Sequence, residues 1–413
     1  MSDRLQVPRG TFDVLGEDAL ARDALAATAK GILERAGYER IETPTFEATE
    51  LFARGVGEST DIVQKEMYSF ESAGGESFTL RPEGTAPVAR AYLEHGMHKA
   101  PQPVKLWYLS SFFRAERPQR GRYRQFWQVG AEAIGASEPA VDAELIVLLA
   151  ELLEALGVQG TRLRLASLGQ PESRAAYREE LQGYLRANED RLSPEVRDRI
   201  ELNPLRAFDA EHAGTRAVMA AAPLLQDRLS PEDAEHFDTV RELLDATGVA
   251  YELDPTLVRG LDYYTRTVFE FTSDALGAQS GVGGGGRYDG LISQLGGPPT
   301  PGCGWAAGVE RMLLAAQAPA VAPPVVDVYV AAAGPEQRTA AFKLADEIRR
   351  AGHAARLELA GRSIKGVFKQ AGKLGARYVA VLDAGGVALK DMESGTQQTV
   401  AADTVMHHIR GRM

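Results

Sequence analysis

A proline- and alanine-rich segment divides this sequence of 413 residues into two parts with different patterns. The segment occupies residues 318–324, Ala-Pro-Ala-Val-Ala-Pro-Pro, and this composition is typical of an extended, semi-rigid linker. Beyond it, residues 325–413 alternate strand-like and helix-like runs. That alternation predicts a small C-terminal α/β domain with a mixed, mainly parallel sheet.

Residues 1–317 follow a different order and predict a larger α+β domain. Within them, residues 139–156 predict a helix that is apolar enough to be buried, and the clearest strand-like runs lie at 77–81, 104–114 and 123–134. Few of these runs are joined by crossover helices, so we predict a mainly antiparallel sheet flanked by helices. Between about residues 170 and 223 the sequence is helical and charged, and we interpret this part as a helical insertion into the larger domain.

The charge of the chain is unevenly distributed. Its formal net charge is −11, but residues 325–413 carry 13 basic and 9 acidic side chains, against 33 and 48 in the rest. A basic C-terminal domain on an acidic body is compatible with a localised contact to a polyanion. The first residues lack the apolar core of a signal peptide, and no apolar run is long enough to span a membrane. We therefore expect a cytoplasmic protein that does not contact a membrane.

Cysteine and histidine usage argues against disulfide and metal chemistry. The single cysteine, Cys303, excludes an internal disulfide and a cysteine-rich zinc cluster. The seven histidines are scattered, and no spacing of His, Cys, Asp or Glu indicates a zinc site. We therefore expect no metal ion that is bound by the protein alone.

Two neighbouring runs predict a small-molecule site. Residues 257–270, Leu-Val-Arg-Gly-Leu-Asp-Tyr-Tyr-Thr-Arg-Thr-Val-Phe-Glu, look like a strand but contain several ionisable groups that must be solvated, paired or held for a ligand. Residues 281–290, Gly-Val-Gly-Gly-Gly-Gly-Arg-Tyr-Asp-Gly, leave backbone that a ligand can approach closely. A dinucleotide-binding turn is the alternative, but the βαβ unit that it requires is missing. The two runs together make the chain a candidate enzyme.

A third run, residues 112–132, is dense in arginine. Its five arginines are Arg114, Arg117, Arg120, Arg122 and Arg124. They fall between two strand-like arms, and guanidinium groups match phosphate oxygens in paired hydrogen bonds, so such a hairpin can bind phosphate. A solvated, charged hairpin tip is the alternative for the loop alone. The arms favour a site, because they embed Gln128 and Glu132 in strand.

These runs resemble the class II aminoacyl-tRNA synthetases. Phe113-Arg-Ala-Glu116, followed by Arg122-x-x-x-Phe126, is similar to motif 2 of that class, and Gly308-Val-Glu-Arg311 is similar to motif 3. The predicted strand that ends at Pro44 is similar to motif 1, which implies a homodimer. Within the class, Arg259-Gly-Leu-Asp-Tyr-Tyr264 and Gly283-Gly-Gly-Gly-Arg-Tyr-Asp289 resemble the two signatures of the histidyl-tRNA synthetases. The resemblance covers essentially the whole chain.

The resemblance implies ATP-dependent activation of L-histidine to histidyl-adenylate, followed by transfer of the histidyl group to a histidine-accepting tRNA. ATP is then a substrate, accompanied by Mg²⁺, and residues 325–413 are similar to an anticodon-binding domain. A non-catalytic, histidine-sensing regulatory paralogue is the alternative. Such paralogues lack the anticodon-binding domain and tend to lose the arginines that contact ATP, whereas this chain keeps both.

The resemblance also implies roles for individual residues. For catalysis it marks Arg259 and Arg114. For ATP binding it marks Arg114, Glu116, Arg122, Phe126 and Arg311. For histidine binding it marks Glu83, Thr85, Gln128, Glu132, Arg259, Tyr263, Tyr264 and Tyr288. A neutral imidazole offers one donor and one acceptor, and Glu132 and Tyr264 are the residues expected to answer them.

Local explanations compete with some of these assignments. Glu83 and Thr85 lie in Pro-Glu-Gly-Thr, which is also good chemistry for a helix start. Tyr263 and Tyr264 cannot both face one side of a strand, so one of them is expected to be structural. For Arg287 and Tyr288, the alternative to a role in the site is that both side chains lie on the protein surface.

Candidate tRNA contacts fall in two places. In the arginine-rich run they are Arg117, Gln119 and Arg124. In the C-terminal domain they are Arg362, Lys365, Lys369 and Lys373. The second group recurs at three- and four-residue steps, which places it on one helix face. A solvated helix face is the commoner explanation of such a stripe, and contact with the RNA backbone is the competing one.

Overall fold

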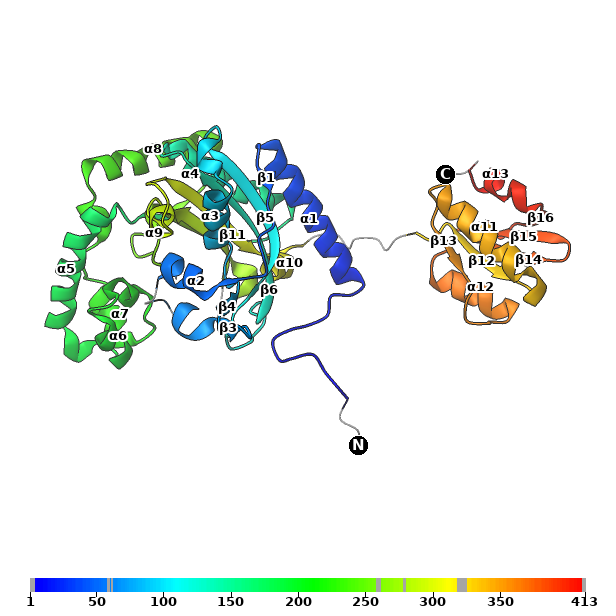
Figure 1. Ribbon diagram of the computed structural model, residues 1–413, viewed down its shortest axis with the longest axis horizontal. Coiled ribbons are helices and arrows are strands. Elements are labelled where there is room, and N and C mark those ends of the chain that lie inside the picture. The colour runs from blue at the N-terminus through cyan, green and yellow to red at the C-terminus, as the bar shows by residue number, and fades with distance from the viewer. Residues whose placement is uncertain are drawn as a thin grey trace. The chain divides into compact units, whose positions relative to one another are not determined.

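The structure is a computed structural model that separates into two compact units, Met1–Val321 and Ala322–Met413 (Figure 1). It describes residues 4–57, 60, 62–257, 261–277, 280–317 and 325–410, apart from the side chains of residues 209 and 410. The proline- and alanine-rich segment 318–324 and Arg259 therefore lie outside the described residues. Each unit is described by itself below.

An eight-stranded sheet forms the centre of the larger unit, in the order β1-β5-β6-β11-β10-β9-β7-β8. The strands are β1 (Glu39–Arg40), β5 (Val104–Phe113), β6 (Gln125–Ile134), β11 (Gly302–Gly308), β10 (Gly281–Arg287), β9 (Thr265–Ser273), β7 (Thr161–Ser167) and β8 (Glu252–Leu253). All neighbours from β5 to β7 pair antiparallel, and only the two-residue edge strands pair parallel. The prediction of a mainly antiparallel sheet is confirmed.

One face of this sheet is apolar and is covered by helices. They are α1 (Glu17–Arg35), α4 (Pro139–Ala155), α8 (Pro231–Thr247) and α10 (Val309–Ala315). Leucines of α4 pack with Trp107 and Trp305 of the sheet in one buried cluster. Proline occupies the first turn of α4 and α8, where its missing N–H costs no helical hydrogen bond. The apolar run 139–156 is thus a buried helix, as predicted.

The opposite face of the sheet carries the polar residues. Alternation along β5 sends Trp107 into the apolar cluster and Tyr108 into a second cluster on the other side. The elements on this side are α3 (Thr85–Glu94), α2 (Thr49–Val56), α9 (Leu291–Gln294) and a three-stranded sheet of β2 (Phe46–Ala48), β4 (Ser77–Leu80) and β3 (Tyr68–Glu71). The candidate site lies among them.

Residues 171–228 form short helices with a core of their own. The main ones are α5 (Pro171–Ala187), α6 (Pro194–Arg199) and α7 (Ala213–Met219). Tyr177, Leu181 and Leu185 of α5 are buried in that core against Val218 of α7. Figure 1 shows α5, α6 and α7 gathered on one side of the larger unit, apart from α1. This group follows β7 directly, so its first turn starts from the edge of the main sheet.

The C-terminal unit has a five-stranded sheet in the order β13-β12-β14-β15-β16. These strands are β13 (Ala355–Leu357), β12 (Val328–Ala332), β14 (Tyr378–Asp383), β15 (Gly386–Asp391) and β16 (Gln397–Val400). The sheet is mixed, as predicted, with parallel pairs between the first three strands and antiparallel hairpins after β14. Helices α11 (Arg338–Arg350) and α13 (Val405–Arg410) pack in one core, and α12 (Ile364–Lys373) packs in another. Among the residues that the structure describes, no helix combines the length and apolarity needed to cross a membrane.

Candidate active site

A cavity of about 430 Å³ opens between the hairpin of β5 and β6 and the adjoining strands β11, β10 and β9. Its lining includes Arg114, Glu116, Arg122, Phe126, Gln128, Glu270, Gly281, Gly283, Gly284, Gly308, Glu310 and Arg311. All five residues that the sequence marks for ATP line this cavity, although they come from two separate stretches of the chain. Gln128, marked for histidine, lines it as well.

The arginine hairpin is held in a defined shape. The Nε of Arg114 donates to the Pro82 carbonyl at 2.9 Å, and its guanidinium lies 5.4 Å from the centre of the Phe126 ring. Glu116 lies between two arginines, with its carboxylate 3.2 Å from Arg122 Nη1 and 3.8 Å from Arg114 Nη1. These contacts fix the planar cations at the cavity wall, where they can bind an anion in paired hydrogen bonds.

An N-terminal segment braces the tip of this hairpin, and sequence reasoning missed it. The backbone N–H of Arg124 donates to the Gly10 carbonyl at 2.8 Å. The Phe12 ring lies 4.6 Å from the ring of Tyr123, which itself lines the cavity. A side chain at residue 10 would meet Pro118 at 2.8 Å, in a backbone with φ +91. The available sequence signal was Gly10 followed two residues later by the aromatic Phe12, but only the folded hairpin shows what these two residues contact.

The glycine strand β10 forms the opposite wall of the cavity. Gly283 and Gly284 line it, which agrees with the expectation that a ligand approaches this backbone. Gly285 serves a different purpose, because a Cβ there would lie 1.9 Å from the Gly304 carbonyl oxygen of β11. The run therefore combines backbone that is accessible from the cavity with unusually close strand pairing.

Helix α10, where the resemblance to motif 3 lies, contributes two charged residues to the cavity lining, Glu310 and Arg311. Glu310 accepts from the backbone N–H of Trp127 at 3.0 Å and from Arg22 Nη2 at 2.6 Å, so it ties β6 and α1 to the helix start. Burial, and after it the nearby charge of Arg122, lower the pKa of Arg311. The positive charges of Arg122 and Arg311 repel each other beside the cavity, and an anion that binds between them offsets this repulsion.

A buried polar cluster lies beside the cavity, centred on Glu132. Its Oε1 accepts from Thr85 Oγ1 at 2.8 Å and from the Tyr108 hydroxyl at 3.4 Å, and its Oε2 accepts from the Tyr288 hydroxyl at 2.7 Å. Burial raises the pKa of Glu132 to about 8, despite hydrogen bonds that oppose the shift. A carboxyl with this pKa can accept or donate near neutral pH, which is the property needed to bind imidazole.

Glu83 extends the cluster toward α3. Its carboxylate accepts from the backbone N–H groups of Thr85 at 2.8 Å and Ala86 at 3.0 Å, so it caps the start of the helix. The helix-start interpretation is therefore confirmed. The Tyr263 hydroxyl reaches the same carboxylate at 3.5 Å, and burial raises the pKa of Glu83.

Tyr263 and Tyr264 lie in a turn that precedes β9. The predicted strand over 257–270 is wrong for residues 261–264, because β9 begins only at Thr265. The two rings are 4.8 Å apart and share one buried cluster with Tyr288, whose ring lies 5.8 Å from that of Tyr263. The alternation argument that separated the two tyrosines fails, since it applies only within a strand.

Gln128 connects the cavity with the buried cluster. It lies on β6 two and four residues from Phe126 and Glu132, so alternation places all three side chains on the same face. Its Oε1 is buried and has no hydrogen-bond partner among the residues that the structure describes. Buried acceptors are almost always satisfied, so this oxygen is a candidate acceptor for a ligand.

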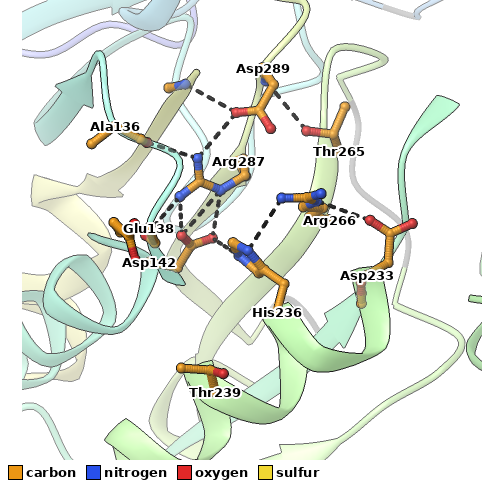
Figure 2. A network of polar contacts seen from close by, with 12 residues as sticks. Ala136, Glu138, Asp142, Asp233, His236, Thr239, Thr265, Arg266, Arg287 and Asp289 are labelled. Atoms are coloured by element: carbon orange, nitrogen blue, oxygen red, sulfur yellow. Dashed lines mark hydrogen bonds and ion pairs between the residues drawn. The ribbon is translucent and has the colours of Figure 1, made fainter. Parts of the chain in front are cut away.

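Behind the cluster, Arg287 is fully buried in a network of charged groups (Figure 2). Its Nε lies 3.2 Å from both carboxylate oxygens of Asp142, and its Nη1 donates to Asp289 at 3.2 Å and to the Ala136 carbonyl at 3.0 Å. The surface alternative for Arg287 and Tyr288 is wrong, because Tyr288 is buried as well. No local pattern could have shown this, since Asp142 lies 145 positions away.

Some of the candidate tRNA contacts have exposed side chains, and others form hydrogen bonds within the protein. Arg117 and Gln119 are exposed at the hairpin tip, whereas Arg124 donates to the Glu116 carbonyl at 3.2 Å. Lys365, Lys369 and Lys373 are exposed along α12. Arg362, just before that helix, binds Glu358 at 3.0 Å.

The residue types that bind metal ions are not clustered in the described part of the chain. Within it, no group of three or more His, Cys, Asp or Glu residues could hold a metal ion. Cys303 is buried, and burial raises the pKa of its thiol, so it packs in the core.

Comparisons with known proteins agree over almost the full length. A profile of the family described as Histidyl-tRNA synthetase matches residues 10–312, and a profile described as Anticodon binding domain matches residues 327–412. The chain is 48% identical to the Histidine–tRNA ligase of Streptomyces avermitilis over 99% of both chains. It is 45% identical to that of Desulforamulus reducens over 98% of this chain and 99% of the other. Its fold is similar to the crystal structure of apo S. aureus histidyl-tRNA synthetase, with a TM-score of 0.81 and 34% identity, over 98% of this chain and 100% of that one.

Replacing Glu132 by glutamine should remove a pH dependence of stability. Between the ordinary pKa of 4.5 and the folded value of about 8, the folded protein holds a proton that the unfolded chain has released. The free energy of unfolding contributed by Glu132 is therefore complete below about pH 4.5 and is lost as pH rises through about 8. The melting temperature of Glu132→Gln, measured relative to wild type, should rise over this range. A difference that stays constant with pH would contradict the assignment.

Proposed function

Because this chain belongs to the histidyl-tRNA synthetase family, we propose that its arginine-lined cavity holds ATP and that the Glu132 cluster beside it receives L-histidine. The enzyme activates histidine with ATP and transfers the histidyl group to a histidine-accepting tRNA. One observation carries the site assignment. Arg114, Arg122 and Arg311 line the same cavity as bare glycine backbone, and Gln128 joins that cavity to the buried carboxyl–tyrosine cluster.

The first step requires positioning and positive charge. A carboxylate oxygen of histidine forms a bond to the α-phosphorus of ATP, and the bond from that phosphorus to the bridging oxygen of pyrophosphate breaks. The second step forms a bond between a hydroxyl of the terminal ribose of tRNA and the histidyl carbonyl carbon, and AMP leaves. Both steps develop negative charge on oxygen, so fixed cations aimed at that charge accelerate them.

Arg114 is suited to the α-phosphate. Its Nε is already held by the Pro82 carbonyl at 2.9 Å, so its terminal nitrogens are presented in a fixed plane. Arg122 and Arg311 then bind the triphosphate tail, whose negative charge offsets the repulsion between the two guanidinium groups. Arg259, assigned by resemblance to the other side of the same phosphate, completes the set.

Glu116 and Phe126 are suited to the adenine. The Phe126 ring lines the cavity and offers a flat surface for the purine, while Glu116 can accept from its amino group. Mg²⁺ enters with ATP, bound by the phosphates, and reduces the repulsion between their charges.

The buried cluster is suited to histidine. Glu132 and Tyr264 answer the two nitrogens of the imidazole, and Tyr263 and Tyr288 close the pocket around them. Glu83, Thr85 and the unsatisfied oxygen of Gln128 then hold the ammonium and carboxylate end. Such a pocket rejects analogues that leave its buried groups unpaired, by on the order of 10⁴ in favourable cases.

Histidine-dependent exchange of labelled pyrophosphate into ATP tests the proposal. Wild-type protein should exchange only with histidine and Mg²⁺ present. Arg114→Ala should lose about 10²–10³-fold in rate, because one donor to the developing charge is gone. We expect the same of Arg259→Ala. Arg120→Ala, from the exposed tip of the same hairpin, is the matched control and should exchange normally.

A regulatory, histidine-sensing role is the alternative function. A protein of that kind would bind histidine and show no exchange. No feature of the structure favours it, since Arg114, Arg122 and Arg311 all line the cavity and residues 327–412 match an anticodon-binding domain. Near-normal exchange in Arg114→Ala would instead remove that residue from the mechanism.

We propose that the lysine stripe of α12 contacts the tRNA backbone. Changing Lys365, Lys369 and Lys373 together to alanine should raise KM for tRNA on the order of tenfold and flatten its dependence on salt, because three phosphate contacts are lost. Pyrophosphate exchange should not change. The matched control removes Lys343 and Arg350 of α11, which form exposed ion pairs with Glu347 and Asp346. Equal effects of the two variants on tRNA charging would contradict a specific contact.

We also propose a homodimer in which the three-stranded sheet meets a second copy. Phe46 and Phe70 of that sheet are 48% and 44% exposed, and their ring centres lie 5.7 Å apart. This aromatic surface follows the motif-1 segment that ends at Pro44. Phe46→Glu with Phe70→Glu should shift the mass in sedimentation from dimer toward monomer. Phe342→Glu, at a 63% exposed aromatic of the C-terminal unit, should not. A monomeric wild type would overturn the proposal.

A further inference from the structure

The turn that carries the pocket tyrosines is held from outside the pocket, by the helices of residues 171–228. Arg174, in the first turns of α5, donates through Nη2 to the Tyr264 carbonyl at 2.7 Å. Asn203 of the same group lies 3.4 Å from the Asp262 carboxylate, two residues earlier in the turn. Tyr264 thus has its ring in the pocket and its backbone tied to α5.

A buried carboxylate makes a second connection between the same parts. Asp233 of α8 accepts from Arg266 Nε at 2.9 Å through one oxygen. Its other oxygen accepts from the Gln170 backbone and from Ser173 Oγ, both at 3.1 Å, at the start of α5. Burial alone would raise the pKa of Asp233, but these hydrogen bonds lower it overall. The carboxylate therefore stays charged and joins α5 to Arg266.

The backbone of Arg266 explains why this anchor matters. Its φ is +42, and it is the one residue other than glycine with a positive φ among those that the structure describes. Its N–H donates to the Gly169 carbonyl at 2.9 Å, and its carbonyl accepts from Leu168. The pairing of β9 with β10 shifts register at the same point, where Arg287 pairs with Thr265. A bulge of this kind redirects the chain, so that both tyrosines before it enter one cluster.

Figure 2 shows that the anchor continues into the network behind the pocket. Arg266 Nη1 lies 3.4 Å from His236 Nδ1, and His236 Nε2 lies 3.6 Å from Asp142, the partner of Arg287. An arginine can only donate, so Nδ1 is the acceptor in this contact, and Nε2 faces Asp142. Only Thr265 separates Arg266 from Tyr264, and Tyr288 directly follows Arg287. One buried network thus supports two walls of the pocket.

We propose that Arg174 and Arg266 are positioning residues for the histidine pocket, coupling its geometry to α5 and α8. Neither is assigned a contact with substrate. Arg174 holds the backbone of Tyr264, and Arg266, anchored by Asp233, holds the bulge that directs Tyr263 and Tyr264 inward. The proposal rests on the assignment of this cluster to histidine.

Steady-state pyrophosphate exchange with full-length protein tests it, with Arg174→Gln and Arg266→Gly. Glycine adopts φ +42 without strain, so the second variant removes the guanidinium, and with it the anchor to Asp233, without adding backbone strain. Both should raise KM for histidine by about tenfold or more, while KM for ATP stays within about twofold. The reason is that the charged hydrogen bonds lost in these variants support the histidine pocket and not the ATP cavity. Arg266→Lys, which keeps the charge, should restore part of the affinity. Arg178→Gln is the matched control, because Arg178 lies one turn along α5 and, among the described residues, donates to the Glu201 and Leu202 carbonyls at 2.6 and 2.8 Å.

The possible failures are distinguishable. No histidine-dependent exchange in wild type would overturn the proposed function itself. Normal wild-type exchange with an unchanged histidine KM in Arg174→Gln would overturn the coupling alone. So would parallel increases in both KM values together with a lowered melting temperature, which would make these arginines merely structural. If Arg266→Gly does not fold, Arg174→Gln decides, since it removes a single hydrogen bond.

Discussion

Burial of the Glu132 carboxyl is the constraint on which the rest of the catalytic unit depends. An ionisable group without contact to water is tolerated only when its oxygens are hydrogen-bonded. The three hydroxyls that do this come from α3, β5 and the end of β10, so those elements must meet at one point. A Cβ on Gly304 of β11 would lie 1.7 Å from the same carboxyl, so even the strand beside it must leave room. The register of the sheet and the composition of the pocket are therefore one requirement.

The two faces of the sheet divide the work of stability and function. Leucine, valine and tryptophan fill the face under α1, α4 and α8, where burial of apolar surface stabilises the fold. The other face contains buried polar groups, and their burial costs part of that stability. The buried pair of Arg287 and Asp142 lies at the boundary between the two faces. A buried ion pair contributes little net stability, but loss of one partner leaves a charge without compensation. This pair joins α4 to the end of β10, directly before Tyr288.

Much of the fold could be predicted from the sequence, because its signals are local. Helix α4 was expected over 139–156 and spans Pro139–Ala155, and β6 was expected over 123–134 and spans Gln125–Ile134. Apolar periodicity and proline punctuation are enough for such elements. The cavity lining of Arg114, Glu116, Arg122, Phe126 and Arg311 followed from family resemblance, whereas composition alone left the arginines as a charged hairpin tip. The roles assigned to them stay predictions.

What could not be predicted depends on partners far away in the chain. Asp142 and Arg287 are separated by 145 positions, and nothing near either residue indicates burial. The predicted strand over 257–270 is wrong before Thr265 because tyrosines favour strands, and the bulge at Arg266, near the start of β9, is held by Asp233 of the distant helix α8. Tertiary contacts of this kind override local propensity.

The brace of Gly10 and Phe12 on the arginine hairpin has a practical consequence for anyone handling this protein. The outer lip of the arginine-lined cavity is supported by a segment of chain that precedes the first helix. Affinity tags, protease sites and trimmed expression boundaries are usually placed at such ends on the assumption that nothing there touches the chemistry. Here, a change made ahead of α1 reaches Tyr123 through a single ring contact. Preparations that lack this segment therefore lose part of the support of the hairpin that lines the cavity.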